Sequence, residues 1–303
     1  MELSKAAGEL VGKIRDCFLS QYNDPLSPKT QKSLNVLCVR LVFCFYAEDA
    51  GLFGPKDAFS RYILQYKPTD IRGKLIELFR VLDRPVSDRA DMYLDDEVAA
   101  FPYVNGGLFS DENIVIPRLT QEIKDALQEA ARFDWSKISP TIFGAVFEST
   151  LNPETRRAGG MHYTSIENIH KVIDPLFLDD LKAEFEEIKN ISVLRTQEKK
   201  LHALQDKLAS LLFLDPSAGS GNFLTESYLQ LRKLENEILR ILTHGQIMFG
   251  VVANPIKVSI SQFYGIEIND FAVTVARTAL WIAETRCSKR QRTSSTCSWT
   301  SCR

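Results

Sequence analysis

Leu214-Asp215-Pro216-Ser217-Ala218-Gly219-Ser220-Gly221-Asn222-Phe223-Leu224 is a glycine-rich turn between a short apolar run and the start of a helix. Residues 211–214 supply the predicted strand. Gly219 and Gly221 let the backbone bend tightly and approach a ligand with no Cβ in the way. The helix that opens at Asn222 carries apolar residues at helical spacing, so one of its faces can pack on a sheet. This order of strand, turn and helix predicts a cradle for a nucleotide-type cofactor.

Two phosphate-binding motifs do not fit this turn, because the turn lacks their key residues. A dinucleotide fold needs a third glycine where Leu224 stands, and a P-loop needs Lys followed by Ser or Thr where Asn222 and Phe223 stand. A generic tight turn explains the glycines alone. The full pattern D-P-x-x-G-x-G-x-F resembles motif I of S-adenosylmethionine-dependent DNA amino-methyltransferases. That resemblance implies cofactor binding by Asp215, Pro216, Ala218, Gly219, Gly221 and Phe223.

A second strand with an acidic residue near its end is predicted over residues 263–268. Glu267 could accept hydrogen bonds from both ribose hydroxyls of a cofactor, with Ile268 beside it, although a solvated glutamate at a strand end is the simpler alternative. A helix with an apolar stripe follows and completes a β-α-β-α order. The distance from Asp215 to Glu267 exceeds the roughly 20 residues of a compact unit, which predicts that residues 242–261 loop out.

A third segment, residues 159–165, leads into a helix that Thr164 or Ser165 can cap. The free N–H groups of such a helix end could receive the carboxylate of the cofactor. The segment resembles motif X of amino-methyltransferases, which implies that Tyr163 and Thr164 bind the cofactor. A loop that simply feeds a capped helix is the alternative. His162 is interpreted as a packing or hydrogen-bonding residue, and the other histidines, His170, His202 and His244, show no metal-ligand spacing.

The flanking residues narrow the resemblance. Residues 142–148, 152–157, 37–43 and 47–53 look like the large fused restriction-modification enzymes typified by MmeI, and the similarity covers about residues 3–284. The resemblance implies a mixed fold: a helical spacer at 1–140, then the N-terminal part of a Rossmann-like α/β methyltransferase domain at 141–285. It also implies adenine-N6 methylation of duplex DNA with S-adenosylmethionine.

The catalytic motif of that family is missing from this sequence. Amino-methyltransferases hold the exocyclic amine of a flipped base with N-P-P or D-P-P followed by an aromatic residue. The nearest string, Asn254-Pro255-Ile256, lacks the second proline and the aromatic residue and is interpreted as a turn. We therefore predict no catalytic residue in this chain. A separate polypeptide could supply the catalytic and target-recognition parts.

The last 18 residues, 286–303, differ in composition from the rest. They contain five basic residues, no acidic residue and three of the six cysteines, a composition that predicts a disordered tail. A basic arm for nucleic acid is one interpretation. A frameshift that truncated a longer methyltransferase gene is the preferred hypothesis, and the DNA sequence downstream would reject it if it held no methyltransferase frame.

The overall composition fits a cytoplasmic protein of two domains. The chain has 303 residues, of which 45% are hydrophobic and 25% charged, and no run approaches the ~18 apolar residues of a membrane span. The net charge of −2 gives no general attraction to DNA. The local basic groups at 13–15, 72–74 and 156–157 are more simply solvated faces. The spacing of the cysteines predicts neither disulfides nor zinc.

Two further expectations concern packing. In the helix at 34–46, an apolar stripe from Leu34 to Phe45 is interpreted as part of the core rather than as a cofactor-binding face. Apolar surface around Leu280 and Trp281 is expected to be exposed, because the strands that would follow are missing.

Two functions stay open: a DNA methyltransferase, and a non-catalytic remnant that at most binds the cofactor or acts as a scaffold.

Overall fold

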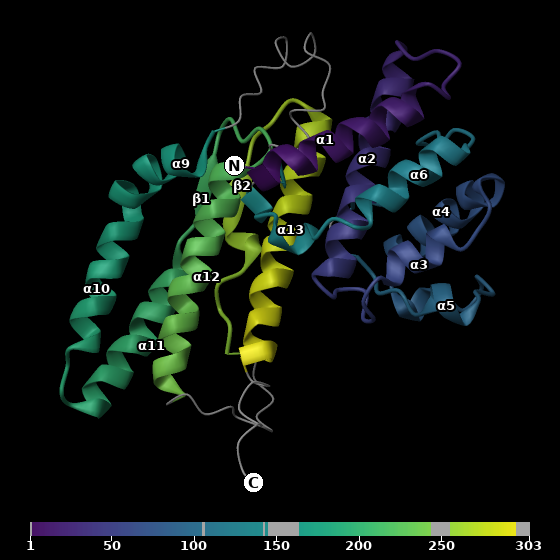
Figure 1. Cartoon of the computed structure of the whole chain (residues 1–303). Coiled ribbons are helices and arrows are strands. Elements are labelled where there is room, and N and C mark those ends of the chain that lie inside the picture. The colour runs from purple at the N-terminus through teal and green to yellow at the C-terminus, as the bar shows by residue number, and fades with distance from the viewer. Residues whose placement is uncertain (1, 105–106, 142, 145–163, 244–254, 295–303) are drawn as a thin grey trace.

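The computed structural model describes residues 2–104, 107–141, 143–144, 164–243 and 255–294. Two groups of helices flank α13 (Figure 1). The first group comprises α1 (Glu2–Leu19), α2 (Pro28–Asp49), α3 (Ala58–Leu64), α4 (Pro68–Asp83), η1 (Val86–Asp88), α5 (Asp96–Ala99), α6 (Gln121–Ala130) and η2 (Trp135–Lys137). The second comprises α9 (Ile166–Ile173), the π-helical η3 (Asp174–Leu178), α10 (Asp179–Lys189), α11 (Leu194–Ser210), β1 (Phe213–Asp215), α12 (Asn222–Leu242), η4 (Ile260–Gln262) and β2 (Phe263–Gly265). Helix α13 (Asp270–Ser294) follows β2 and lies between the two groups.

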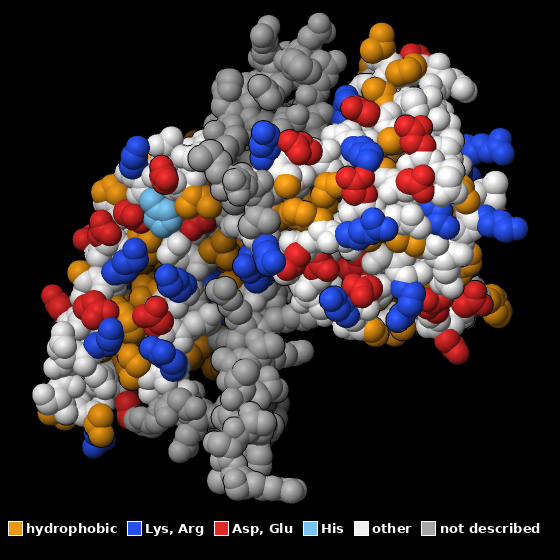
Figure 2. Space-filling view, viewed as in Figure 1, with side chains coloured by type: hydrophobic (Ala, Val, Ile, Leu, Met, Phe, Trp, Pro, Cys, Tyr) orange, Lys and Arg blue, Asp and Glu red, His pale blue; other side chains and the backbone are white. Residues whose placement is uncertain are grey.

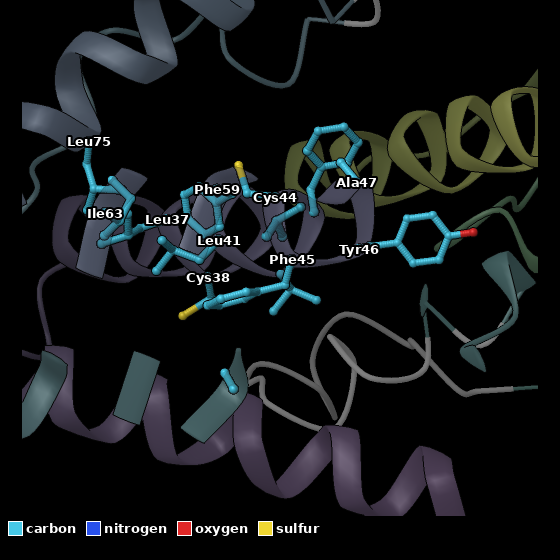
Figure 3. Packing of buried hydrophobic residues seen from close by; sticks show 14 of the residues in the cluster. Leu37, Cys38, Leu41, Cys44, Phe45, Tyr46, Ala47, Phe59, Ile63 and Leu75 are labelled. Carbon is cyan, nitrogen blue, oxygen red and sulfur yellow. The ribbon is translucent and has the colours of Figure 1, made fainter. Parts of the chain in front are cut away.

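Helix α2 is the centre of the first group. It begins where the Ser27 hydroxyl accepts a hydrogen bond from the Thr30 N–H at 3.2 Å, with Pro28 in the first helical position. The stripe from Leu34 to Phe45 is buried in the core as expected, and the burial extends beyond it to nearly every residue from 33 to 48. Figure 3 shows its side chains among Phe59 and Ile63 of α3 and other core residues. Since α1, α3, η2 and α13 surround it, α2 has no solvent-facing side over this stretch.

A carboxyl group is enclosed in this core. Glu48 is 3% exposed, and its two oxygens accept hydrogen bonds from the Ser60 N–H at 2.8 Å and the Ser60 hydroxyl at 2.7 Å. Burial outweighs these bonds and raises the pKa of Glu48 to about 7. The folded state therefore binds this proton more tightly than the unfolded chain, whose glutamates titrate near 4.5.

Glu48 is expected to make stability depend on pH. Its stabilising contribution is fully present below about pH 4.5 and is lost as the pH rises through 7, a change of about 3 kcal/mol. Glu48→Gln keeps both contacts to Ser60 without a charge, so its free energy of unfolding lacks this component. Denaturant titrations of both proteins from pH 4.5 to 8 should show the wild type falling relative to the variant. A constant difference across that range would contradict the expectation.

The small sheet joins β1 and β2 in parallel, with Leu214 opposite Tyr264. The order β1-α12-β2-α13 confirms the predicted β-α-β-α arrangement, and α12 begins at Asn222 as expected. Both strands are shorter than predicted. One face is covered: the rings of Phe213 and Phe263 stack at 4.9 Å, and Tyr228 of α12 lies against Phe263.

The opposite face of the sheet is open. Leu214 is 63% and Tyr264 53% exposed, and Leu212 and Ile266 are exposed with them. The expectation of exposed apolar surface around residues 280 and 281 is wrong, because both are partly buried and the Trp281 ring lies 5.3 Å from that of Phe43 in α2. The exposed apolar surface thus lies on the sheet instead.

The segment before β2 is attached to the helices over its described part. Glu235 of α12 accepts hydrogen bonds from the backbone N–H of Lys257 at 2.6 Å and of Val258 at 3.2 Å. Gln205 of α11 donates to Glu235 at 2.9 Å and to the Pro255 carbonyl at 2.6 Å. The prediction of a segment that loops out is therefore wrong for residues 255–261. Residues 244–254, which include Asn254 and His244, lie outside the described residues.

The end of the chain also departs from expectation. Helix α13 continues to Ser294, so residues 286–294 of the predicted disordered tail are helical, and Cys287 is buried. A helix that is already nucleated adds further residues at little cost, which explains how it extends beyond the apolar pattern. Residues 295–303 lie outside the described part.

Candidate cofactor site

The turn between β1 and α12 is tied to the end of β2. The Ile266 N–H donates to the Asp215 carbonyl at 2.9 Å, and the Ala218 N–H donates to the Ile266 carbonyl at 3.0 Å. The Asp215 carboxylate accepts from the Ser217 N–H at 3.0 Å and so closes the turn locally. These bonds bring the loops after both strands to the same edge of the sheet, where parallel α/β sheets bind ligands.

The two glycines of the turn have different surroundings. Both have positive φ, 52° at Gly219 and 76° at Gly221. A Cβ at Gly219 would meet no atom within 4 Å, whereas a Cβ at Gly221 would lie 2.8 Å from the Cβ of Ala276 in α13. Only Gly219 therefore leaves open space that a ligand could use. The expectation that Gly221 does the same is corrected: it allows α13 to approach α12.

This difference can be tested with a matched pair of alanine variants. Gly219→Ala and Gly221→Ala each force a non-glycine residue into the left-handed region, at a cost of about 1–2 kcal/mol. Gly221→Ala adds overpacking against Ala276, which should cost a further 1–3 kcal/mol or so. Chemical denaturation should therefore find Gly221→Ala the less stable of the two. Equal stabilities would contradict the assigned role of Gly221.

Glu267 lies directly against the glycine turn. One carboxylate oxygen accepts from the Gly219 N–H at 2.9 Å, and the other accepts from the Asn269 N–H at 2.8 Å. A carboxylate offers about four acceptor positions, so about two stay available for hydroxyl donors. The free acceptor positions of Glu267 beside the open space at Gly219 are the groups that the two hydroxyls of a cofactor ribose would need.

The remaining predicted site residues lie in varied surroundings. Ala218 is buried and Pro216 exposed, Phe223 packs against the small apolar cluster of α9, and Ile268 is 95% exposed. Thr164 is half-buried and immediately precedes the cap of α9. Ser165 is that cap, since its hydroxyl accepts from the Asn168 N–H at 3.3 Å. Tyr163 and His162 lie outside the described residues.

A polar cluster that the sequence did not predict lies beside this turn. Glu226 of α12 is 5% exposed and accepts hydrogen bonds from Thr141 and Gln230, while His170 of α9 lies 3.3 Å away. The sequence carries no signal for this burial, because Glu226 falls outside the apolar stripe of the predicted helix. Nothing in the sequence could pair it with His170.

The proposed basic groups are engaged within the protein where they are described. Lys13 pairs with Glu129, Lys74 with Glu77, and Arg72 donates to the carbonyl of Ile116. Figure 2 shows basic and acidic side chains interspersed over the face of the first helical group. Residues 156–157 lie outside the described part.

The described residues contain no group of three or more His, Cys, Asp or Glu side chains arranged to hold a metal ion. None of the helices described is both long and apolar enough to cross a membrane.

Comparison with known proteins extends this picture. A family model for the DNA-methyltransferase domain of MmeI matches residues 191–299, and one for the MmeI helicase spacer domain matches residues 32–109. The solved structure of the type IIL restriction-modification enzyme MmeI in complex with DNA superposes with a TM-score of 0.78 at 39% identity, over 94% of this chain and 36% of that one. The chain belongs to the MmeI-like family.

Two further proteins are similar to most of this chain. DNA methyltransferase A of Bacillus subtilis is 38% identical over 281 residues, covering 92% of this chain and 30% of the relative. A putative type II restriction enzyme and methyltransferase of Methanocaldococcus jannaschii is 24% identical over 82% of this chain and 24% of the relative. The chain thus spans about a third or less of the length of these relatives.

Proposed function

We propose that this MmeI-like chain is the cofactor-binding part of an S-adenosylmethionine-dependent DNA methyltransferase of restriction-modification type that methylates the N6 amine of adenine. The proposal rests on the hydrogen bond between the Gly219 N–H and the Glu267 carboxylate. This bond brings together in one site the glycine turn and the carboxylate that would bind the ribose. Residues 1–140 would form the spacer and residues 141–285 the N-terminal part of a Rossmann-like methyltransferase domain. Such a function would place the chain with DNA in the cytoplasm.

Each proposed site residue has a defined task. Glu267 would accept the ribose hydroxyls, and Gly219 would let the backbone approach the cofactor. Asp215, Pro216, Ala218 and Gly221 would hold the shape of the turn, while Ile268 and Phe223 would contact the cofactor beside it. Tyr163 and Thr164 would bind its methionine end near the N-terminus of α9. When bound, the cofactor supplies the methyl group, and orientation of that group toward the amine is the main contribution expected of the protein.

A second candidate function is cofactor binding without catalysis. The sequence holds no N-P-P or D-P-P motif followed by an aromatic residue, and the open face of the sheet carries Leu212, Leu214, Tyr264 and Ile266. The relatives are about three times as long or longer. A separate polypeptide that carries the remaining part of the methyltransferase domain would extend the sheet with its strands, cover this face with its helices and supply the catalytic motif.

Calorimetric titration with S-adenosylmethionine, beside a methyl-transfer assay on mixed duplex DNA, tests both candidates. Saturable binding without transfer supports the non-catalytic function, and transfer by this chain alone supports the enzyme. Transfer that requires an added catalytic fragment of a relative supports the divided arrangement. A chain that is folded by circular dichroism but releases no binding heat, and shows no competition with a labelled cofactor, would contradict the proposed cofactor site.

A further inference from the structure

Glu226 connects three separate parts of the chain beside the glycine turn. One oxygen accepts from the hydroxyl of Thr141 at 2.8 Å, and the other accepts from the Gln230 amide at 2.7 Å and faces the His170 Nε2 at 3.3 Å. Glu226 lies in the second turn of α12, one helical turn beyond Asn222, where the glycine turn ends. Its carboxylate is therefore fixed relative to that turn.

His170 connects the two helices that flank the candidate site. Its Nδ1 lies 2.8 Å from the carboxylate of Asp174, four residues further along the chain, and its Nε2 faces Glu226 of α12. The first contact stays within the α9–η3 segment. The second links α9 to α12 through polar groups.

Apolar contacts alone give α9 few constraints. Its cluster contains three buried residues, Ile169, Ile173 and Leu178, with Phe223 and Phe177 partly buried against them. The outer side is open, since Val172 is 49% and Leu176 71% exposed. The C-terminal end of α9 continues through η3 into α10, but because apolar contact is not directional, the small cluster by itself fixes the N-terminal end of α9 only weakly. A hydrogen bond to a fixed carboxylate removes the freedom that remains.

We propose that the hydrogen bond between His170 and Glu226 fixes α9 against α12, and thereby positions the segment around Thr164 for the cofactor. His170 is a positioning residue in this scheme, because it acts through the helix it anchors. The consequence for the cofactor rests on the proposed function, whereas the anchoring of α9 does not.

Two amide variants separate the two contacts of the ring. His170→Asn places its amide nitrogen where Nδ1 stands and keeps the bond to Asp174. His170→Gln reaches the position of Nε2 and keeps the bond to Glu226. The proposal expects amides of α9 to exchange hydrogen faster in His170→Asn, while His170→Gln stays close to the wild type. It also expects about ten-fold weaker S-adenosylmethionine binding by His170→Asn alone.

Equal exchange of α9 in both variants would overturn the proposal, since a local role within α9 makes no distinction between them. Thermal midpoints of both variants near that of the wild type exclude general unfolding as the cause. Absence of cofactor binding in the wild type would reject the proposed function and the positioning role, and the exchange data would still decide whether His170 anchors the helix.

Discussion

Replacing Glu235 with leucine is expected to lower the free energy of unfolding by roughly 3–5 kcal/mol. Glu235 is fully buried and pairs with Arg232, which is also fully buried. Among the described residues, the Nε and Nη2 atoms of Arg232 have no hydrogen-bond partner. The variant would therefore leave a buried guanidinium without its carboxylate, and would release the backbone N–H groups of Lys257 and Val258.

The double variant Arg232→Met with Glu235→Leu is the control. It removes both charges and fills the space with apolar side chains, so most of the lost stability should return. A residual loss of about 1–3 kcal/mol is expected from the two unsatisfied N–H groups. Urea denaturation of the three proteins measures these differences. A double variant no more stable than Glu235→Leu would show that the buried charge is not the source of the loss.

Replacing Glu267 with glutamine is expected to weaken S-adenosylmethionine binding by about 100-fold. The amide is isosteric but uncharged, and hydrogen bonds to a charged acceptor contribute roughly 1.5–3 kcal/mol each. In the wild type, the two carboxylate oxygens accept hydrogen bonds from the N–H groups of Gly219 and Asn269. The glutamine amide would turn its own N–H toward one of these two N–H groups. Calorimetric titration of the folded variant gives the dissociation constant directly.

Asp270→Asn provides the matched control for charge. Asp270 is exposed, lies three residues further along and is also acidic, so this substitution removes the same charge in the same region. Its dissociation constant should stay within about two-fold of the wild-type value, because exposed charges are screened. If both variants weaken binding equally, Glu267 acts through general electrostatics and does not contact the ribose.

The sequence alone predicted the features that depend on residues close together in the chain. The glycine turn, the helix start at Asn222 and the capping by Ser165 depend on residues within a few positions of one another. The β-α-β-α order follows from the alternation of short apolar runs with helical spacing. The meeting of the glycine turn with Glu267 was also predictable, because the carboxyl ends of parallel neighbouring strands share one edge.

Other features depend on partners distant in the chain, and only the tertiary structure decided them. The apolar stripe in α2 predicted its place in the core, but only the structure shows that helices from several parts of the chain enclose it on all sides. Gly219 and Gly221 look equivalent in the sequence, and the approach of Ala276 distinguishes them. His170 and Glu226 stand 56 positions apart, and no periodicity relates them. Local sequence therefore determined the elements and the chemistry of the turn, while long-range packing, which depends on the shapes of surfaces that meet only in the folded chain, decided which side chains complete the site.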